Sequence, residues 1–209
     1  MIESLEQRRF LSATALIAPA LTHVLTMQPP GVGAAHEGME QERLAEIEEW
    51  ALEQFGKIKD LLTGIGDGSD QANNEAGWLS RAIVDAVKGE RVGGDQLPGN
   101  MGNYTGGNQC GDWQAIIGNA IVEVLPPFNE SKFKVYMVQA FDADGDEHNW
   151  IEIDGQNGTV VVDPWPNGGT GEINDTSVWN QFTFNKSRTR ILTDPQSSDS
   201  GENLPPIIE

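Results

Sequence analysis

Apolar residues follow a helical period in the first half of the chain and a strand period in the second half. Between Leu44 and Leu62 they recur at steps of three and four, with Glu and Gln on the other faces, and the glycine-rich segment 64–68 follows. This pattern predicts an amphipathic helix that ends at the glycines. The same reasoning predicts a second helix from about Asn74 to Lys88. Both helices are more typical of a scaffold than of a functional site.

A third helix is expected to begin near Cys110. Its apolar stripe consists of Trp113, Ile116, Ile117, Ala120, Ile121 and Val124. Two consecutive prolines follow, at 126 and 127, and they predict the end of the helix because proline cannot donate the next backbone hydrogen bond.

From Phe133 onward the period changes to two. Alternation of apolar and polar positions predicts strands at 133–141, 148–153, 159–163, 178–184 and 188–192. Segment 142–146 is expected to be a turn, and 154–158 a hairpin loop. Helices followed by antiparallel strands predict an α+β fold.

The length suits a single domain, here expected at 37–193, with a helical part at 37–92 and the third helix and sheet at 93–193. Residues 1–36 read as a leader: a basic pair precedes an apolar run, and small residues at 18–20 could be cleaved. The string LEQRRFLSA at 5–13 resembles a short motif of exported planctomycete proteins. We expect export or a cell-surface location, with a disordered tail and a cytoplasmic location as the alternative. Residues 194–209 are expected to be a disordered tail.

Charge excludes several classes of partner. The chain has 13 Lys and Arg against 32 Asp and Glu, a formal net charge of −19. Binding to nucleic acid or to an anionic membrane needs clustered basic residues, and no stretch is apolar enough to span a bilayer. Residues 101–170 carry ten acidic residues and only Lys132 and Lys134 as basic ones. We expect this acidity to favour cationic or neutral substrates and to raise the pKa of a histidine among them.

The only cysteine of the chain, Cys110, is either a small buried residue or a reactive thiol. One cysteine excludes an internal disulfide and a cysteine-rich zinc site. Cys110 stands at the predicted start of the third helix, in GGNQCGDW. There the unpaired backbone N–H groups and the positive end of the helix dipole favour a thiolate and can stabilise an oxyanion. These features favour the reactive thiol.

A thiol nucleophile also needs a base and a group that orients the base. His148 is the only histidine after residue 36, and Asp163 ends the next predicted strand. If the hairpin loop spans 154–157, Ile153 pairs with Gly158, and His148 lies directly opposite Asp163 on the same face. A slip of one residue would move Asp163 to the other face.

The helix-start Cys110, the strand HNWIEI at 148–153 and the segment VDPW at 162–165 occur in an order that resembles the transglutaminase-like core of the papain-like cysteine-protein superfamily. The resemblance covers residues 96–165. It implies a papain-like fold of helices packed on an antiparallel sheet. The chain departs from the family at Asn149, where a small residue is commoner, and it lacks the Arg and Gly-Ile-Pro-like turn that many members carry between Cys and His.

The resemblance implies that Cys110 is the nucleophile, His148 the general base and acid, and Asp163 the orienting residue. It implies acyl chemistry on a protein or peptide amide, and it leaves protease, deamidase and transglutaminase activities open. No cofactor and no metal are expected. Candidates for oxyanion or substrate contacts are Gln109, Tyr104, Asn108 and Trp150.

Two further alternatives stay open. The chain can be a non-catalytic exported acidic module, for binding or structure, that keeps the fold.

The run DADGDE at 142–147 suggests a calcium-binding loop. Its glycine is fourth and the twelfth residue is Ile153, whereas an EF-hand loop has Gly sixth and Glu twelfth. A hairpin turn with solvated carboxylates is therefore favoured. Glu152 is also expected to be solvated.

Overall fold

The computed structural model describes residues 32–93, 108–169, 171–193 and 207–208, with side chains placed from residue 39 to residue 193 within these ranges. Most of the predicted leader and most of the predicted tail lie outside them. The chain divides into two units, Met1–Glu40 and Gln41–Glu209. The second unit contains Cys110, His148 and Asp163.

Three helices occur where the apolar stripes predict them: α2 at Val32–Ile65, α3 at Asp70–Gly93 and α4 at Cys110–Val124. Helix α3 begins after Ser69, whose hydroxyl oxygen accepts a hydrogen bond from the Ala72 N–H at 3.1 Å. Helix α4 ends just before the two prolines, as predicted. In the described part of the chain, no helix is both long and apolar enough to cross a membrane.

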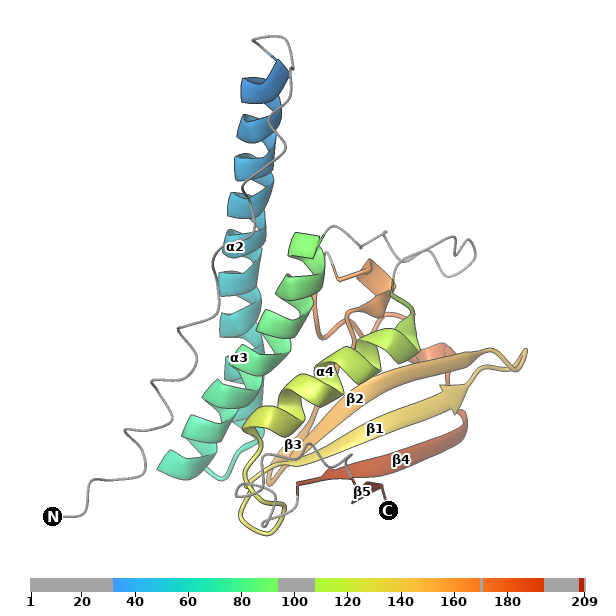
Figure 1. The fold of residues 1–209 in the computed structure, drawn as a ribbon. Helices are drawn as coiled ribbons and strands as arrows, with labels where there is room; N and C mark the ends of the chain where they lie inside the picture. The colour runs from blue at the N-terminus through green and yellow to red at the C-terminus, as the bar shows by residue number, and fades with distance from the viewer. Residues whose placement is uncertain (1–31, 94–107, 170, 194–206, 209) are drawn as a thin grey trace, which may run out of the picture. The chain divides into compact units, whose positions relative to one another are not determined.

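The strands form an antiparallel sheet in the order β3-β2-β1-β4-β5. Their bounds are Lys134–Phe141 for β1, Glu147–Gly155 for β2, Gly158–Val162 for β3, Phe184–Leu192 for β4 and Ile207–Ile208 for β5. Figure 1 shows α4 running across the sheet over β2 and β1, with α3 beside it. The α+β class is confirmed.

The strand predicted at 178–184 is wrong. A short 3₁₀ helix, η2, occupies Trp179–Gln181, and β4 begins only at Phe184. Hydrogen bonds such as that from the Phe182 N–H to the Trp179 carbonyl close this turn. Phe182 is buried in an apolar cluster against which Val178 and Trp179 pack. The apolar residues therefore serve a folded loop and not a strand.

The β2–β3 hairpin is tighter than predicted. Gly155 pairs with Gly158 and Ile153 with Val160, so the loop has two residues, Gln156 and Asn157, and the register differs from the predicted one by two. Because a shift of two preserves the alternation of side chains, every residue keeps its predicted face.

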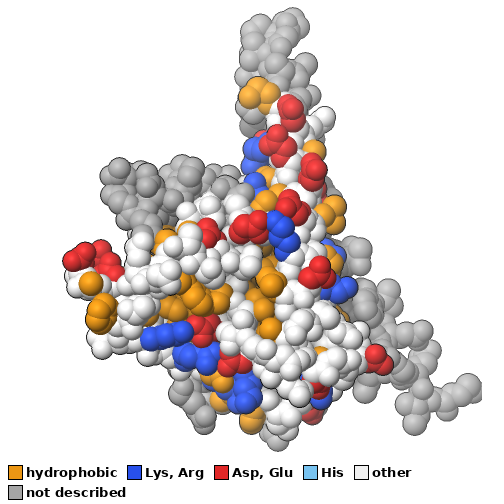
Figure 2. Space-filling model, turned by 180° about the vertical axis from the view of Figure 1, so that it is seen from behind, with side chains coloured by type: hydrophobic (Ala, Val, Ile, Leu, Met, Phe, Trp, Pro, Cys, Tyr) orange, Lys and Arg blue, Asp and Glu red, His pale blue; other side chains and the backbone are white. Residues whose placement is uncertain are grey.

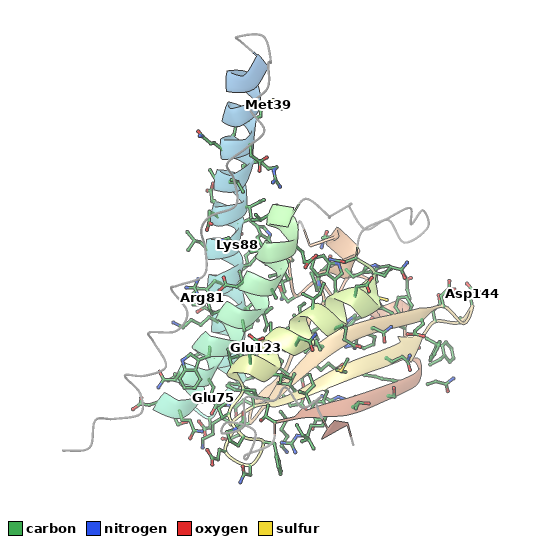
Figure 3. The ribbon with its side chains drawn as sticks, viewed as in Figure 1. Met39, Glu75, Arg81, Lys88, Glu123 and Asp144 are labelled. Atoms are coloured by element: carbon green, nitrogen blue, oxygen red, sulfur yellow. The ribbon has the colours of Figure 1, made fainter. Side chains whose placement is uncertain are left out.

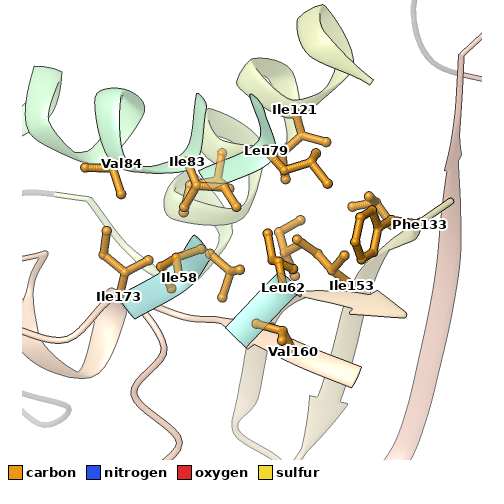
Figure 4. Close-up of a cluster of buried hydrophobic side chains, with 14 of the residues drawn as sticks. Ile58, Leu62, Leu79, Ile83, Val84, Ile121, Phe133, Ile153, Val160 and Ile173 are labelled. Carbon is orange, nitrogen blue, oxygen red and sulfur yellow. The ribbon is translucent and has the colours of Figure 1, made fainter. Parts of the chain in front are cut away.

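The main core lies between the helices and one face of the sheet. Figure 4 shows Ile58 and Leu62 of α2 gathered with Leu79 and Ile83 of α3, Ile121 of α4 and Ile153 of β2, all buried. A smaller cluster consists of Val138, Ala140, Trp150, Val161 and Phe182. Alternation along β2 places Trp150 and Ile151 on opposite faces. Both faces of β2 are therefore buried, and its residues are held firmly.

Candidate functional site

The candidate site lies where the start of α4 meets the start of β2. Cys110 is the first residue of α4, His148 is the second residue of β2, and Asp163 directly follows β3. Helix α4 begins here because Gln109 forms its N-cap and the Gln109 N–H donates to the Asp112 carboxylate at 2.9 Å.

His148 and Asp163 form a buried pair. The distance from His148 Nε2 to Asp163 Oδ2 is 2.6 Å, and the two side chains are 0% and 1% exposed. In the observed register Asp163 follows Val162, which pairs with Ile151, so Asp163 reaches His148 diagonally and not from directly opposite. The Asp163 N–H donates to the Ile173 carbonyl at 2.6 Å, and this bond holds the aspartate at the end of its strand.

Aromatic rings enclose the imidazole of His148. Its centroid lies 4.8 Å from that of Phe182, 5.0 Å from that of Trp165 and 5.4 Å from that of Trp150. These rings exclude water and restrict rotation of the imidazole. The orientation of the ring is therefore set by packing as well as by Asp163.

Asp163 occupies Nε2, which leaves Nδ1 as the ring nitrogen available to Cys110. Nδ1 is buried and makes no hydrogen bond of normal geometry to the described residues. Cys110 is half-buried, and its thiol is near enough to the ring for the interaction to shift the pKa of both groups. A buried ring nitrogen of this kind can accept the proton of a thiol.

The pKa shifts favour an ion pair between Cys110 and His148. Partial burial tends to raise the pKa of the Cys110 thiol, but its interactions with His148 and Asn149 outweigh burial, and the pKa is lowered. Burial tends to lower the pKa of His148, but the hydrogen bond to Asp163 and the interaction with the nearby Cys110 thiol raise it to about 9. Burial raises the pKa of Asp163, against the opposing effect of His148. The largest causes of the rise at His148 are these direct partners, and one of them, Asp163, belongs to the acidic residues of 101–170.

Asn149 is a member of the site that sequence reasoning did not select. Its Nδ2 lies 3.8 Å from Cys110 Sγ and 2.5 Å from Glu147 Oε1. The sequence contained one indication: Asn149 stands at a position where a small residue is commoner in the family that residues 96–165 resemble.

The other predicted contact residues are placed differently. Gln109 is exposed beside Cys110, and the Asn108 side chain donates to Glu90 Oε2 at 2.9 Å. The Trp150 indole is buried and donates its N–H to Glu152 Oε1 at 3.0 Å, so this N–H is already engaged by a carboxylate. Tyr104 lies outside the described residues.

Glu152 is buried, contrary to the expected solvated carboxylate. It accepts hydrogen bonds from Trp150 and Lys186, and Arg188 Nε lies 2.8 Å from its Oε2. Figure 2 shows basic side chains next to acidic ones on the molecular surface. Two basic residues of β4 therefore allow this carboxylate to be buried close to the candidate site.

The carboxylate-rich turn lies at the tip of the β1–β2 connection, where Figure 3 labels Asp144. Asp142 Oδ1 accepts hydrogen bonds from the backbone N–H groups of Asp144 and Asp146, at 2.9 and 2.8 Å. Among the described residues, no group of three or more His, Cys, Asp or Glu side chains is arranged to hold a metal ion. The carboxylate of Asp142 serves the turn itself.

No protein-family model matches the chain, and no curated protein or solved structure matches it either.

Proposed function

We propose that the protein carries out cysteine-dependent acyl chemistry on peptide or glutamine-type amides, with Cys110 as nucleophile, His148 as general base and acid, and Asp163 as the residue that orients His148. The observation that carries the proposal is the buried His148–Asp163 pair, which fixes Nε2 and leaves Nδ1 for a thiol at the start of a helix. The proposal includes the finer fold assignment, a papain-like fold of the transglutaminase type, and export of the protein.

Each step has a residue to perform it. His148 removes the proton of Cys110, and the thiolate attacks the amide carbonyl carbon to form a C–S bond. Backbone N–H groups at the start of α4 stabilise the resulting oxyanion. The C–N bond then breaks, and His148 gives its proton to the leaving amine. Water resolves the thioester in a hydrolase, and a second amine resolves it in a transferase.

The rival is a non-catalytic acidic module with the same fold. In such a protein we would expect Cys110 to be sealed in the core and away from His148. The half-exposed Cys110 and the mutual pKa shifts of the two residues support the enzyme.

The test is the rate at which iodoacetamide alkylates the native protein. Since Cys110 is the only cysteine, every label reports on this site. We expect labelling at neutral pH to be faster in the wild type than in His148→Ala and in His148→Gln. The second variant nearly preserves the volume of the buried side chain, and circular dichroism verifies that both are folded. Equal rates in the wild type and a folded His148 variant would refute the proposal.

A further inference from the structure

We propose that the side-chain amide of Asn149 is an oxyanion donor of this site and acts together with the backbone N–H groups at the start of α4. The inference rests on the proposed function, because an oxyanion forms only if Cys110 attacks a carbonyl group.

The amide of Asn149 is held by two contacts. Its nitrogen carries two protons. One is donated to Glu147 Oε1 at 2.5 Å, and Nδ2 lies 3.8 Å from Cys110 Sγ. Since donation to Glu147 uses one of the two protons, the other is left for the contact with Cys110 Sγ.

Asn149 borders the same space as the start of α4. A Cβ atom placed on Gly111 would lie 4.0 Å from Asn149 Nδ2. The first N–H groups of a helix have no partner within the helix. Side-chain and backbone donors therefore meet beside the sulfur, without a side chain at position 111 between them.

This placement suits the chemistry of the attack. The oxyanion is borne by the carbon that Sγ attacks, so its donors must stand close to the sulfur, about 3 Å from the future oxyanion. In the ground state the same N–H contacts the sulfur. As the C–S bond forms, the carbonyl π electrons move to oxygen, and the amide N–H can bond to that oxygen. When the intermediate collapses, the carbonyl re-forms and the leaving group departs with the electrons of its bond to carbon.

The other polar side chains near Cys110 are placed less well for this role. The Asn108 amide donates to Glu90, and the Trp150 indole donates to Glu152. Gln109 is exposed at the N-cap. Glu147 is a positioning residue in this scheme, because its carboxylate accepts the hydrogen bond that orients the Asn149 amide.

Two thiol probes separate the oxyanion role from other roles. In the proposed reaction Cys110 attacks p-nitrophenyl acetate at the carbonyl carbon, and the carbonyl oxygen becomes an oxyanion. When the carbonyl re-forms, p-nitrophenolate leaves and acetyl-Cys110 remains. Iodoacetamide is attacked at a saturated carbon, where iodide leaves and no oxyanion forms. Both rates are measured as a function of pH and compared on their high-pH plateaus. There the thiol is fully deprotonated in every variant, so a change in its pKa does not alter the comparison.

We expect Asn149→Ala and Asn149→Leu to lower the plateau rate of acetylation by about 10²–10³-fold, and to change alkylation by less than a few-fold. Glu147→Ala should lower acetylation by a smaller factor with the same selectivity. Asn119→Ala, an exposed asparagine of α4, is the matched control and should change neither rate.

Unchanged acetylation in the Asn149 variants, or a parallel loss of both rates, would overturn the oxyanion role. That result differs from a failure of the proposed function. If the proposed function fails, the wild type itself shows no His148-dependent reaction with either probe.

Discussion

Asp163 lies diagonally across the β2–β3 pair from His148, and its Oδ2 is 2.6 Å from the histidine Nε2 while both side chains are buried. This pair determines which nitrogen of the imidazole can meet Cys110. The pair also matters for the stability of the fold, because removal of either side chain leaves the other one buried without its partner.

We therefore expect Asp163→Ala to destabilise the protein by about 3–5 kcal/mol, the range found when one member of a buried ion pair is removed. Urea unfolding followed by circular dichroism measures the change. Asp144→Ala, at an exposed turn position, should change the free energy of unfolding by less than about 0.5 kcal/mol. A similar small effect for Asp163→Ala would show that the pair does not form.

The alkylation rate of Cys110 should rise with pH and reach half its maximum below pH 9.0, the usual pKa of the thiol, because interactions with His148 and Asn149 lower that pKa. In His148→Gln the midpoint should move upward, since partial burial of the thiol still disfavours the thiolate. The pH profile of iodoacetamide labelling gives both midpoints. Identical midpoints in the two proteins would contradict the lowered pKa.

Stability should depend on pH through His148. Its pKa rises from 6.5 to about 9 on folding, so the folded state holds the proton more tightly than the unfolded state does. The stabilisation from this proton is fully present below about pH 6.5 and is lost as the pH rises through about 9. The unfolding free energy of the wild type, relative to that of His148→Gln, should therefore fall across this window.

Cys110 acts in the opposite direction, because a lowered thiol pKa adds stability as the pH rises. The unfolding free energies are therefore also compared between Cys110→Ala and the double variant that carries Cys110→Ala and His148→Gln. The fall should persist there, since Asp163 contributes more than Cys110 to the raised pKa of His148. A flat difference in that background would exclude a charged His148 in the fold.

Glu152→Ala should destabilise the protein by about 1–3 kcal/mol, because the buried Trp150 indole loses its acceptor. Lys186→Ala is the matched change on the other side of the ion pair. Its side chain is 41% exposed, and we expect less than about 1 kcal/mol. Thermal unfolding of both variants measures the difference, and equal effects would contradict the structural role of the buried carboxylate.

Gly169→Ala should be more harmful than Gly68→Ala. Both glycines have positive φ, +71° and +77°, so both substitutions carry the cost of a left-handed backbone, about 1–2 kcal/mol. A Cβ atom on Gly169 would also lie 2.8 Å from the Trp113 ring, whereas nothing lies within 4 Å of one on Gly68.

The difference between these two variants isolates the clash, which we expect to cost about 1–3 kcal/mol more. Chemical unfolding provides both values. Equal losses would mean that Trp113 moves aside without cost.

The sequence predicted the elements around the site well, and the hairpin that joins them less well. The alternation of residues from His148 to Asp163 placed both side chains on one face, but the predicted loop was two residues too long. The Asn157 N–H donates to the Ile65 carbonyl at 2.8 Å, and the Asn157 side chain donates to the Gly66 carbonyl at 2.6 Å. The end of α2 thus holds the tight loop, through contacts far apart in the sequence.

Asn149 and Glu152 show the same limit. Each alternates correctly along β2, yet its role depends on what other elements bring beside it: the start of α4 for Asn149, and Lys186 and Arg188 of β4 for Glu152. A strand pattern specifies the face of a residue and not its neighbours on that face.

The sequence by itself determined three helices, the α+β class, the start of α4 at Cys110 and the shared face of His148 and Asp163. These features depend on local periodicity and on residues that end helices. Only the tertiary structure decided the diagonal register, the identity of the free imidazole nitrogen and the approach of Asn149 to the thiol. Those depend on distances between segments, which packing determines and periodicity does not.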